Sequence, residues 1–141
     1  MISIGVAERD GGTLTAALRA LLSERNISAE ARPCAAGGRY DLLLCAVPPP
    51  AGAESPLLAA AEGCAAEAAA RCGAETVLTC GLDPRCTLTP SSLLGEGMAA
   101  LQRETPALSG ALCLPGDLPL PEGGAPEQRL LLAAALLLLE G

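Results

Sequence analysis

Four consecutive residues near the start of the chain, Asp10, Gly11, Gly12 and Thr13, are of the types that hold a phosphate. They follow a short apolar segment and precede a leucine-rich one, so we expect a glycine turn between a strand and a helix. Backbone N–H groups at such a corner, with a hydroxyl beside them, bind anions with little help from other side chains. Residues 8–13 are therefore the first candidate for an anion or nucleotide site.

This loop departs from the P-loop pattern G-x-x-x-x-G-K-[ST] at two positions. Gly12 stands where the lysine belongs, and Glu8 stands where the first glycine belongs. The lysine supplies a point charge that stabilises the phosphates during phosphoryl transfer, so its loss removes a main catalytic contribution. On pattern alone the segment is either an anion site or only a strand-to-helix turn. Carboxylates at Glu8 and Asp10, beside Arg9, could hold a metal, but we predict that they are solvated turn charges.

A second polar group follows another apolar segment, in the sequence GLDPRCTLTPSS. Its candidate binding residues are Asp83, Arg85, Thr87 and Ser91, with Thr89 and Ser92 beside them. Parallel α/β sheets bind ligands at the carboxyl ends of their strands, so the 83–92 loop is the second candidate site. Its arginine could pair with a carboxylate or a phosphate. The alternative is that these residues only form the turn and cap the next helix.

The residue types needed for several common catalytic and metal sites are missing. The chain has no histidine, which removes the Ser-His-Asp triad and the commonest metal ligand. Its 7 cysteines form no C-x-x-C pair and lie mostly inside apolar segments, so we predict buried thiols and no zinc site. These cysteines are Cys34, Cys45, Cys64, Cys72, Cys80, Cys86 and Cys113. We therefore predict no catalytic residues, no bound metal and no cofactor, although weak nucleotide binding could survive through the Gly11, Gly12 and Thr13 N–H groups.

Charge and composition exclude further classes of partner. The net charge of −7 repels nucleic acid and anionic lipid, and Tyr40 is the only aromatic residue, so there is no platform for base stacking. The N-terminus lacks the basic region and apolar core of a signal peptide, which predicts a cytoplasmic protein. The apolar run at 130–139 is about half the length of roughly 20 residues that a membrane-spanning helix needs.

Hydrophobic periodicity predicts the elements that position the two loops. In the first half they are a strand at 1–7, a helix at 13–26, an edge strand at 27–34, a central strand within 39–50 and a helix at 55–73. Thr13 is expected to cap the first helix, and Asn26 to end it. Pro56 at the start and Gly73 just past the end delimit the second.

In the second half the expected elements are a buried strand at 74–83, a loop and short helix within 84–106, a weaker strand at 107–116, an irregular connector at 117–126 and a final helix at 126–141. Alternating strands and helices of this length predict one α/β domain spanning residues 1–141. Its architecture is a three-layer, P-loop or Rossmann-like fold with a mostly parallel sheet and helices on both faces. We predict a buried final helix, with self-association through that helix as the alternative.

Several segments together resemble the central, ATP-binding domain of the Mur ligases and folylpolyglutamate synthases. IGVAERDGGTLTAALRALLSERN is similar to their first strand, T-N-G-K-T-T loop and helix, with Asp10, Gly11, Gly12 and Thr13 at the N-G-K-T positions. AARCGAETVLTCGLDPRCTLTPSSL is similar to their helix and strand ending in T-[YF]-G. The chain's last 28 residues resemble their L-x-G-x-H-N…G ending, and RYDLLLCAVP the strand that carries a catalytic glutamate.

The resemblance implies a catalytically degenerate domain. The phosphate lysine is replaced by Gly12, Ala46 and Val47 stand near the place of the metal-binding glutamate, and the H-N pair is absent. The hypothesis that follows is a non-catalytic binding or assembly module, a pseudoenzyme that acts with a protein partner. The alternative is a nucleotide- or phosphometabolite-binding enzyme or sensor that uses the 8–13 and 83–92 loops. A third hypothesis is a homodimer formed through the last helix, with Leu136 and Leu138 at its interface.

Overall fold

The computed structural model describes residues 1–9, 11–91 and 97–141. The elements of its first half are β1 (Ile2–Ala7), α1 (Thr13–Glu24), β2 (Ala29–Pro33), β3 (Leu42–Cys45), β4 (Leu57–Ala61), α2 (Ala65–Cys72) and β5 (Thr76–Cys80). Those of the second half are β6 (Leu88–Pro90), β7 (Met98–Leu101), β8 (Thr105–Pro106), β9 (Leu112–Cys113), β10 (Gly116–Pro119) and α3 (Pro126–Glu140).

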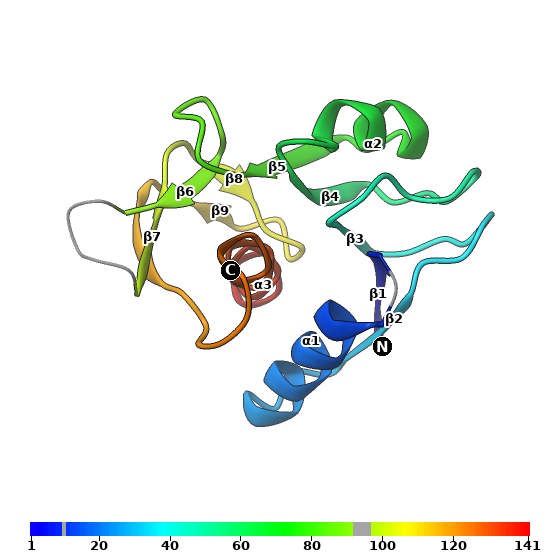
Figure 1. Cartoon of the computed structure of the whole chain (residues 1–141), viewed down its shortest axis with the longest axis horizontal. Helices are drawn as coiled ribbons and strands as arrows, with labels where there is room; N and C mark the ends of the chain where they lie inside the picture. The colour runs from blue at the N-terminus through cyan, green and yellow to red at the C-terminus, as the bar shows by residue number, and fades with distance from the viewer. Residues whose placement is uncertain (10, 92–96) are drawn as a thin grey trace.

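Eight strands form one sheet in the order β10-β7-β6-β5-β4-β3-β1-β2. All neighbours from β2 to β6 run parallel, and β7 and β10 are antiparallel to their neighbours. Helices α1 and α3 lie on one face and α2 lies on the other (Figure 1). The predicted α/β fold, with a mostly parallel sheet between two helical layers, is confirmed.

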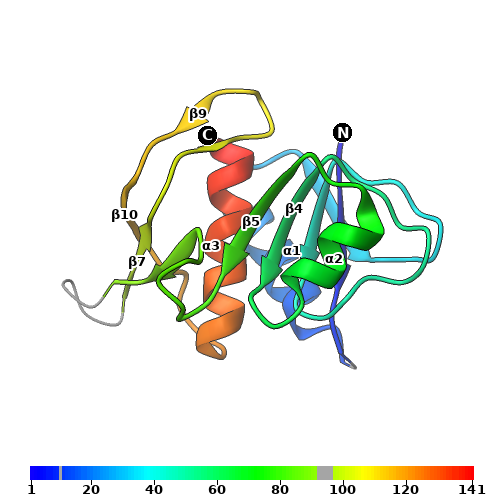
Figure 2. The same cartoon turned by 90° about the horizontal axis from the view of Figure 1, so that it is seen from above.

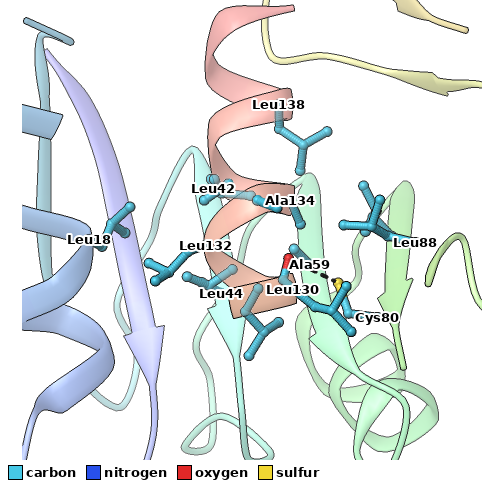
Figure 3. Packing of buried hydrophobic residues seen from close by; sticks show 14 of the residues in the cluster. Leu18, Leu42, Leu44, Ala59, Cys80, Leu88, Leu130, Leu132, Ala134 and Leu138 are labelled. Carbon is cyan, nitrogen blue, oxygen red and sulfur yellow. Dashed lines mark hydrogen bonds between the residues drawn. The ribbon is translucent and has the colours of Figure 1, made fainter. Parts of the chain in front are cut away.

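The final helix α3 is the centre of the larger core. It packs against β3, β4, β5 and β6, and the sheet curves around it (Figure 1). Figure 3 shows Leu132 and Leu138 of this helix among leucines of the sheet and α1, while the Cys80 thiol points to the Leu130 carbonyl at 3.9 Å. The prediction of a buried helix is confirmed. In the described ranges no helix has both the length and the apolar character needed to cross a membrane.

The C-terminal end of α3 is covered by the two-stranded sheet β8–β9. Figure 2 shows β9 beside this end, where the Ser109 hydroxyl donates a hydrogen bond of 2.8 Å to the Gly141 carbonyl. The Leu108 N–H also donates to the Leu138 carbonyl, at 2.9 Å. These bonds satisfy carbonyls that a helix end leaves without intrahelical partners. Of the strand expected at 107–116, only Leu112 and Cys113 form β9, which pairs with β8, and Gly116 already belongs to β10.

The helix predicted at 55–73 is wrong in its first half. Leu57–Ala61 is the strand β4, and only Ala65–Cys72 is helical. Alanine favours a helix when it is isolated, but β4 lies between β3 and β5 and all five of its side chains are buried. Pairing on both sides therefore outweighs local propensity here.

Two later expectations are also wrong. The short helix expected within 84–106 is the antiparallel pair β6 and β7, which adds to the sheet edge. The connector expected at 117–126 contains β10, which pairs with β7. The capping role expected for Ser92 falls outside the described residues. These strands are only three or four residues long, so their pattern is too short to predict pairing.

Loops, not helices, cover the second face of β1. The 34–41 and 46–56 segments run side by side, joined by hydrogen bonds from the Tyr40 N–H to the Glu54 carbonyl at 3.0 Å and from the Glu54 N–H to the Gly38 carbonyl at 2.9 Å. The Tyr40 ring lies against Gly5, where an added Cβ would be 2.9 Å from the ring. Glycine in β1 therefore gives the one aromatic ring of the chain a place on the sheet.

Candidate functional site

The ends of β1 and β3 form the point where the chain crosses to opposite faces of the sheet. After β1 the chain enters α1 on one face, whereas the connection into β3 covers the other face, on the side of α2. The strand order 2-1-3-4-5 is shared with flavodoxin-like sheets, in which ligands bind at the switch point between these two strands. A cleft of about 390 Å³ lies at this position.

The cleft is lined by the end of β1, the loop into α1, the end of β2, the proline segment after β3 and one side chain from α2. The lining residues are Val6, Ala7, Glu8, Arg9, Gly12, Thr15, Pro33, Cys34, Val47, Pro48, Pro49, Pro50 and Arg71. Four of them come from residues 8–15, so the first candidate loop does face a cleft. The three prolines at 48–50, which follow β3, form one wall of the cleft.

Glu8 occupies the N-terminus of α1 with its own carboxylate. Its Oε1 accepts a hydrogen bond from the Leu14 N–H at 2.8 Å, and its Oε2 accepts from the Thr15 N–H at 2.8 Å and the Thr15 hydroxyl at 2.6 Å. These backbone groups are among those that would bind a phosphate at a helix N-terminus. In this structure a residue of the chain itself is their partner.

The glycines of the loop have conformations that explain their presence. Gly11 has φ 104° and Gly12 has φ 64°, both in the region that side chains rarely adopt. Gly12, not Thr13, is the N-cap of α1, so the expected Thr13 cap is wrong: Thr13 is the first helical residue. Asp10 lies outside the described residues. The anion-binding role of these four residues stays a prediction.

Arg71 is a cleft residue that the sequence did not indicate. Its Nη1 donates to the Pro49 carbonyl at 2.9 Å, and its Nη2 donates to Glu67 Oε1 at 2.8 Å. The guanidinium therefore links α2 to the proline wall and is held beside the cleft. No local signal could have found it, because Arg71 is far from the loop in sequence and reads as an ordinary helix-surface charge.

The second candidate loop lies in a separate, smaller cleft of about 240 Å³. Asp83 and Arg85 pair within the turn: Asp83 Oδ1 accepts from the Arg85 N–H at 2.8 Å, and the Asp83 Oδ2 to Arg85 Nη2 distance is 3.1 Å. Hydrogen bonds from Arg85 hold the pKa of the Asp83 carboxyl below its ordinary value. The pair thus satisfies itself on the surface, where both side chains are exposed.

Thr87 and Ser91 do not join that pair. Thr87 is buried and exchanges hydrogen bonds with Thr79: each backbone N–H donates to the other's hydroxyl, at 3.2 and 3.0 Å. Ser91 is also buried, and its N–H donates to the Met98 carbonyl at 3.0 Å. The four candidates therefore divide into an exposed turn and a strand pairing. The structure brings neither group to the first cleft.

Glu62, at the end of β4, organises the second loop and was missed because it was placed within a predicted helix. Its carboxylate accepts from the Leu82 and Asp83 N–H groups at 3.1 and 3.3 Å, and from the Cys86 thiol at 3.4 Å. A Cβ on Gly81 would lie 2.4 Å from this side chain, so a larger residue there would displace the Glu62 carboxylate from its present position. Glu62 and Glu8 thus act alike: each carboxylate accepts hydrogen bonds from backbone N–H groups, of a loop in the case of Glu62 and of the first turn of α1 in the case of Glu8.

The cysteines behave as small apolar side chains. All seven are free thiols; six are buried and Cys34 is half-buried at the cleft wall. Desolvation by burial is the largest cause that raises the pKa of each thiol. They therefore stay protonated near neutral pH and are poor nucleophiles. Within the described ranges no three His, Cys, Asp or Glu residues lie together in a way that could hold a metal ion.

The fold and the cleft define a small α/β domain with a mostly parallel sheet and a ligand-sized cleft at a switch point. Comparisons with protein-family models, curated proteins and solved structures gave no match for this chain.

Proposed function

We propose that this chain is a non-catalytic binding module that holds a small anionic molecule in the cleft between the ends of β1 and β3. The observation that carries the proposal is the position of Arg71 and Arg9 beside a cleft of about 390 Å³ at the switch point. Guanidinium groups bind carboxylates and phosphates through several N–H donors at once.

The charge of the cleft supports an anionic ligand. The chain carries −7 overall, whereas the charged residues that line the cleft, Glu8, Arg9 and Arg71, sum to a formal +1, a local departure from an otherwise acidic molecule. Two of the five N–H donors of Arg71 are used by Pro49 and Glu67, and these contacts orient the group before a ligand arrives. An oriented guanidinium loses less entropy on binding than a free one.

We propose that the chain is not catalytic because of the residue types in the 8–13 loop. Gly12 replaces the lysine that phosphoryl transfer requires, and Glu8 holds the N–H groups at the start of α1. The cleft cysteine, Cys34, has a raised pKa. Descent from a Mur-ligase-like ATPase domain remains a proposal that rests on the sequence resemblance alone.

The structure gives less support to the two alternatives, a pocket shared by the two loops and a dimer formed through α3. A pocket shared by the 8–13 and 83–92 loops would require them to meet, but they line two different clefts. A dimer formed through Leu136 and Leu138 would require these side chains at the surface, but they are 6% and 0% exposed in the monomer. Any self-association through α3 therefore has to use its other residues.

The test is a titration of the ¹⁵N-labelled chain with inorganic phosphate, ATP with and without magnesium, and short aliphatic carboxylates, followed by amide chemical shifts. We expect at least one anion to give saturable shifts at Gly12, Thr15 and Val47. Arg71→Gln should weaken that binding about tenfold, the effect of losing one charge-assisted hydrogen-bonded contact.

The matched control is Arg129→Gln. Arg129 also donates to a proline carbonyl, that of Pro121, at 2.8 Å, but it does not line the cleft. Its replacement should leave anion binding unchanged. If no anion gives saturable shifts at millimolar concentration, or if both arginine variants weaken binding equally, the proposal is wrong.

A further inference from the structure

The walls of the switch-point cleft are mostly uncharged and apolar. Val6 and Ala7, at the end of β1, line the cleft, and Val47 with the prolines at 48–50 forms one of its sides. Proline has a fixed φ and no backbone N–H, so this wall offers carbon surface and little hydrogen bonding to a ligand. A ligand that fills the cleft therefore gains most from an apolar body.

A polyphosphate fits the charged end of the cleft poorly. The N–H groups of Leu14 and Thr15 would receive its oxygens, but the Glu8 carboxylate already accepts from them at 2.8 Å. A chain of phosphates at this point would also lie beside the negative charge of Glu8. Repulsion between like charges opposes that arrangement.

The two arginines of the cleft suit a ligand with a single anionic group. Arg71 is fixed by the Pro49 carbonyl and by Glu67, and it is the oriented guanidinium at the cleft. Its partner Glu67 neutralises part of its charge, which leaves it matched to a single negative charge better than to three or four. Arg9, which is exposed, adds a second positive charge at the rim.

Resting on the proposed function, we infer that the ligand of this cleft is a small monocarboxylate with an apolar body. Its carboxylate lies on the Arg71 guanidinium, and its body lies on the wall formed by Val47 and the prolines. A volume of about 390 Å³ is near the lower end of ligand pockets and suits a short aliphatic acid.

The experiment compares four probes by calorimetric titration of the full chain: hexanoate, hexanol, inorganic phosphate and magnesium ATP. Hexanol tests the apolar body without the charge, and phosphate tests the charge without the body. We expect hexanoate to bind at least about tenfold more tightly than each of the other three, because only hexanoate uses both the guanidinium and the wall.

Two variants locate the binding. Arg71→Gln should weaken hexanoate binding about tenfold and leave hexanol unchanged. Val47→Asn should weaken both hexanoate and hexanol, because it makes the wall polar without touching the cation. Circular dichroism of each variant shows that it is folded. If Arg71→Gln unfolds, Arg71→Lys, which keeps the charge but loses the paired N–H donors of the guanidinium, should still weaken hexanoate binding and leave hexanol unchanged.

The outcomes separate this inference from the proposed function. If phosphate or magnesium ATP binds more tightly than hexanoate and Arg71→Gln weakens it, the inference is overturned and the proposed function stands. If no probe binds, both are overturned. Hexanoate binding that is equal in the wild type and in Arg71→Gln also overturns the inference, because it then reflects apolar association alone.

Discussion

Glu8 and Thr15 are joined by two hydrogen bonds, from the Thr15 N–H at 2.8 Å and from its hydroxyl at 2.6 Å, both to Oε2 of Glu8. Thr15 is 3% exposed and Glu8 is half-buried, so these bonds form in a partly buried position in the first turn of α1. Glu8, the residue directly after β1, thereby fixes the helix that follows. The Leu14 and Thr15 N–H groups at the start of α1 therefore already have an acceptor from the chain itself.

Replacing Glu8 should destabilise the chain. Glu8→Gln removes a charged acceptor from two N–H groups and a hydroxyl, so we expect the free energy of unfolding to fall by about 1–3 kcal/mol. Urea denaturation followed by circular dichroism measures it. Glu24→Gln, on the exposed last turn of α1, is the control and should change stability by less than about 0.5 kcal/mol. Equal losses in the two variants would contradict the role given to Glu8.

The turn conformation at Gly12 can be tested directly. Gly12→Ala places a Cβ at φ 64° with no neighbouring atom within 4 Å, so any loss comes from backbone strain and not from a clash. We expect a loss of about 1–2 kcal/mol in the free energy of unfolding. Gly63→Ala is the matched control, because Gly63 also has open space around it and lies outside the positive-φ group. A Gly12→Ala variant as stable as Gly63→Ala would show that the turn is not strained.

The burial of α3 predicts the result of substitutions at its leucines. Leu138 is 0% exposed, so Leu138→Ala should lower the free energy of unfolding by about 2–5 kcal/mol, and Leu138→Glu should unfold the monomer. Leu114→Ala, at a position 67% exposed, should be close to neutral. Sedimentation with circular dichroism separates unfolding from dissociation. A Leu138→Glu chain that stays folded while its oligomeric mass falls would instead support the dimer hypothesis.

The buried thiols predict how stability changes with pH. A thiol whose pKa is raised in the folded state keeps its proton when the unfolded chain, with an ordinary pKa of 9.0, has lost it. The unfolded state then binds fewer protons, so stability is full below about pH 9 and falls as the pH rises above that value.

Urea denaturation between pH 7 and pH 10.5, in the presence of a reductant, measures this dependence. Cys80→Ala removes one fully buried thiol and should make the decline at high pH shallower, apart from its own packing cost. Stability that stays constant up to pH 10.5 would contradict the burial of these groups.

Much of the fold was predictable because it rests on strong local patterns. The β-branched start, the leucine spacing after Thr13 and the apolar run at 42–45 each specify one element, and each is found. The prediction for residues 55–73 was wrong in part because a run of alanines shows no hydrophobic periodicity. A buried strand and a helix therefore have the same sequence pattern there. The helix predicted within 84–106 was wrong because the strands found there are stabilised by pairing with neighbouring strands and not by their own residue types.

The candidate site was predictable only in part. The turn before α1 could be predicted because it needs residues that adopt a positive φ, and Gly11 and Gly12 mark such a turn in the sequence. Arg71 and Glu62 could not, because their roles depend on partners brought close by the sheet: Pro49 for the first and the Leu82 N–H for the second.

The sequence by itself determined which segments are apolar enough to be buried, where glycine and proline end them, and that the 8–13 loop contains no lysine. These properties are local: they follow from residue type and spacing alone. Only the tertiary structure decided that Leu57–Ala61 is a strand, that Arg71 lies at the cleft of β1 and β3, and that Glu8 fills the N-terminus of α1. Such contacts depend on which strands become neighbours, and that is set by the burial of the whole sheet around α3 and not by any one segment.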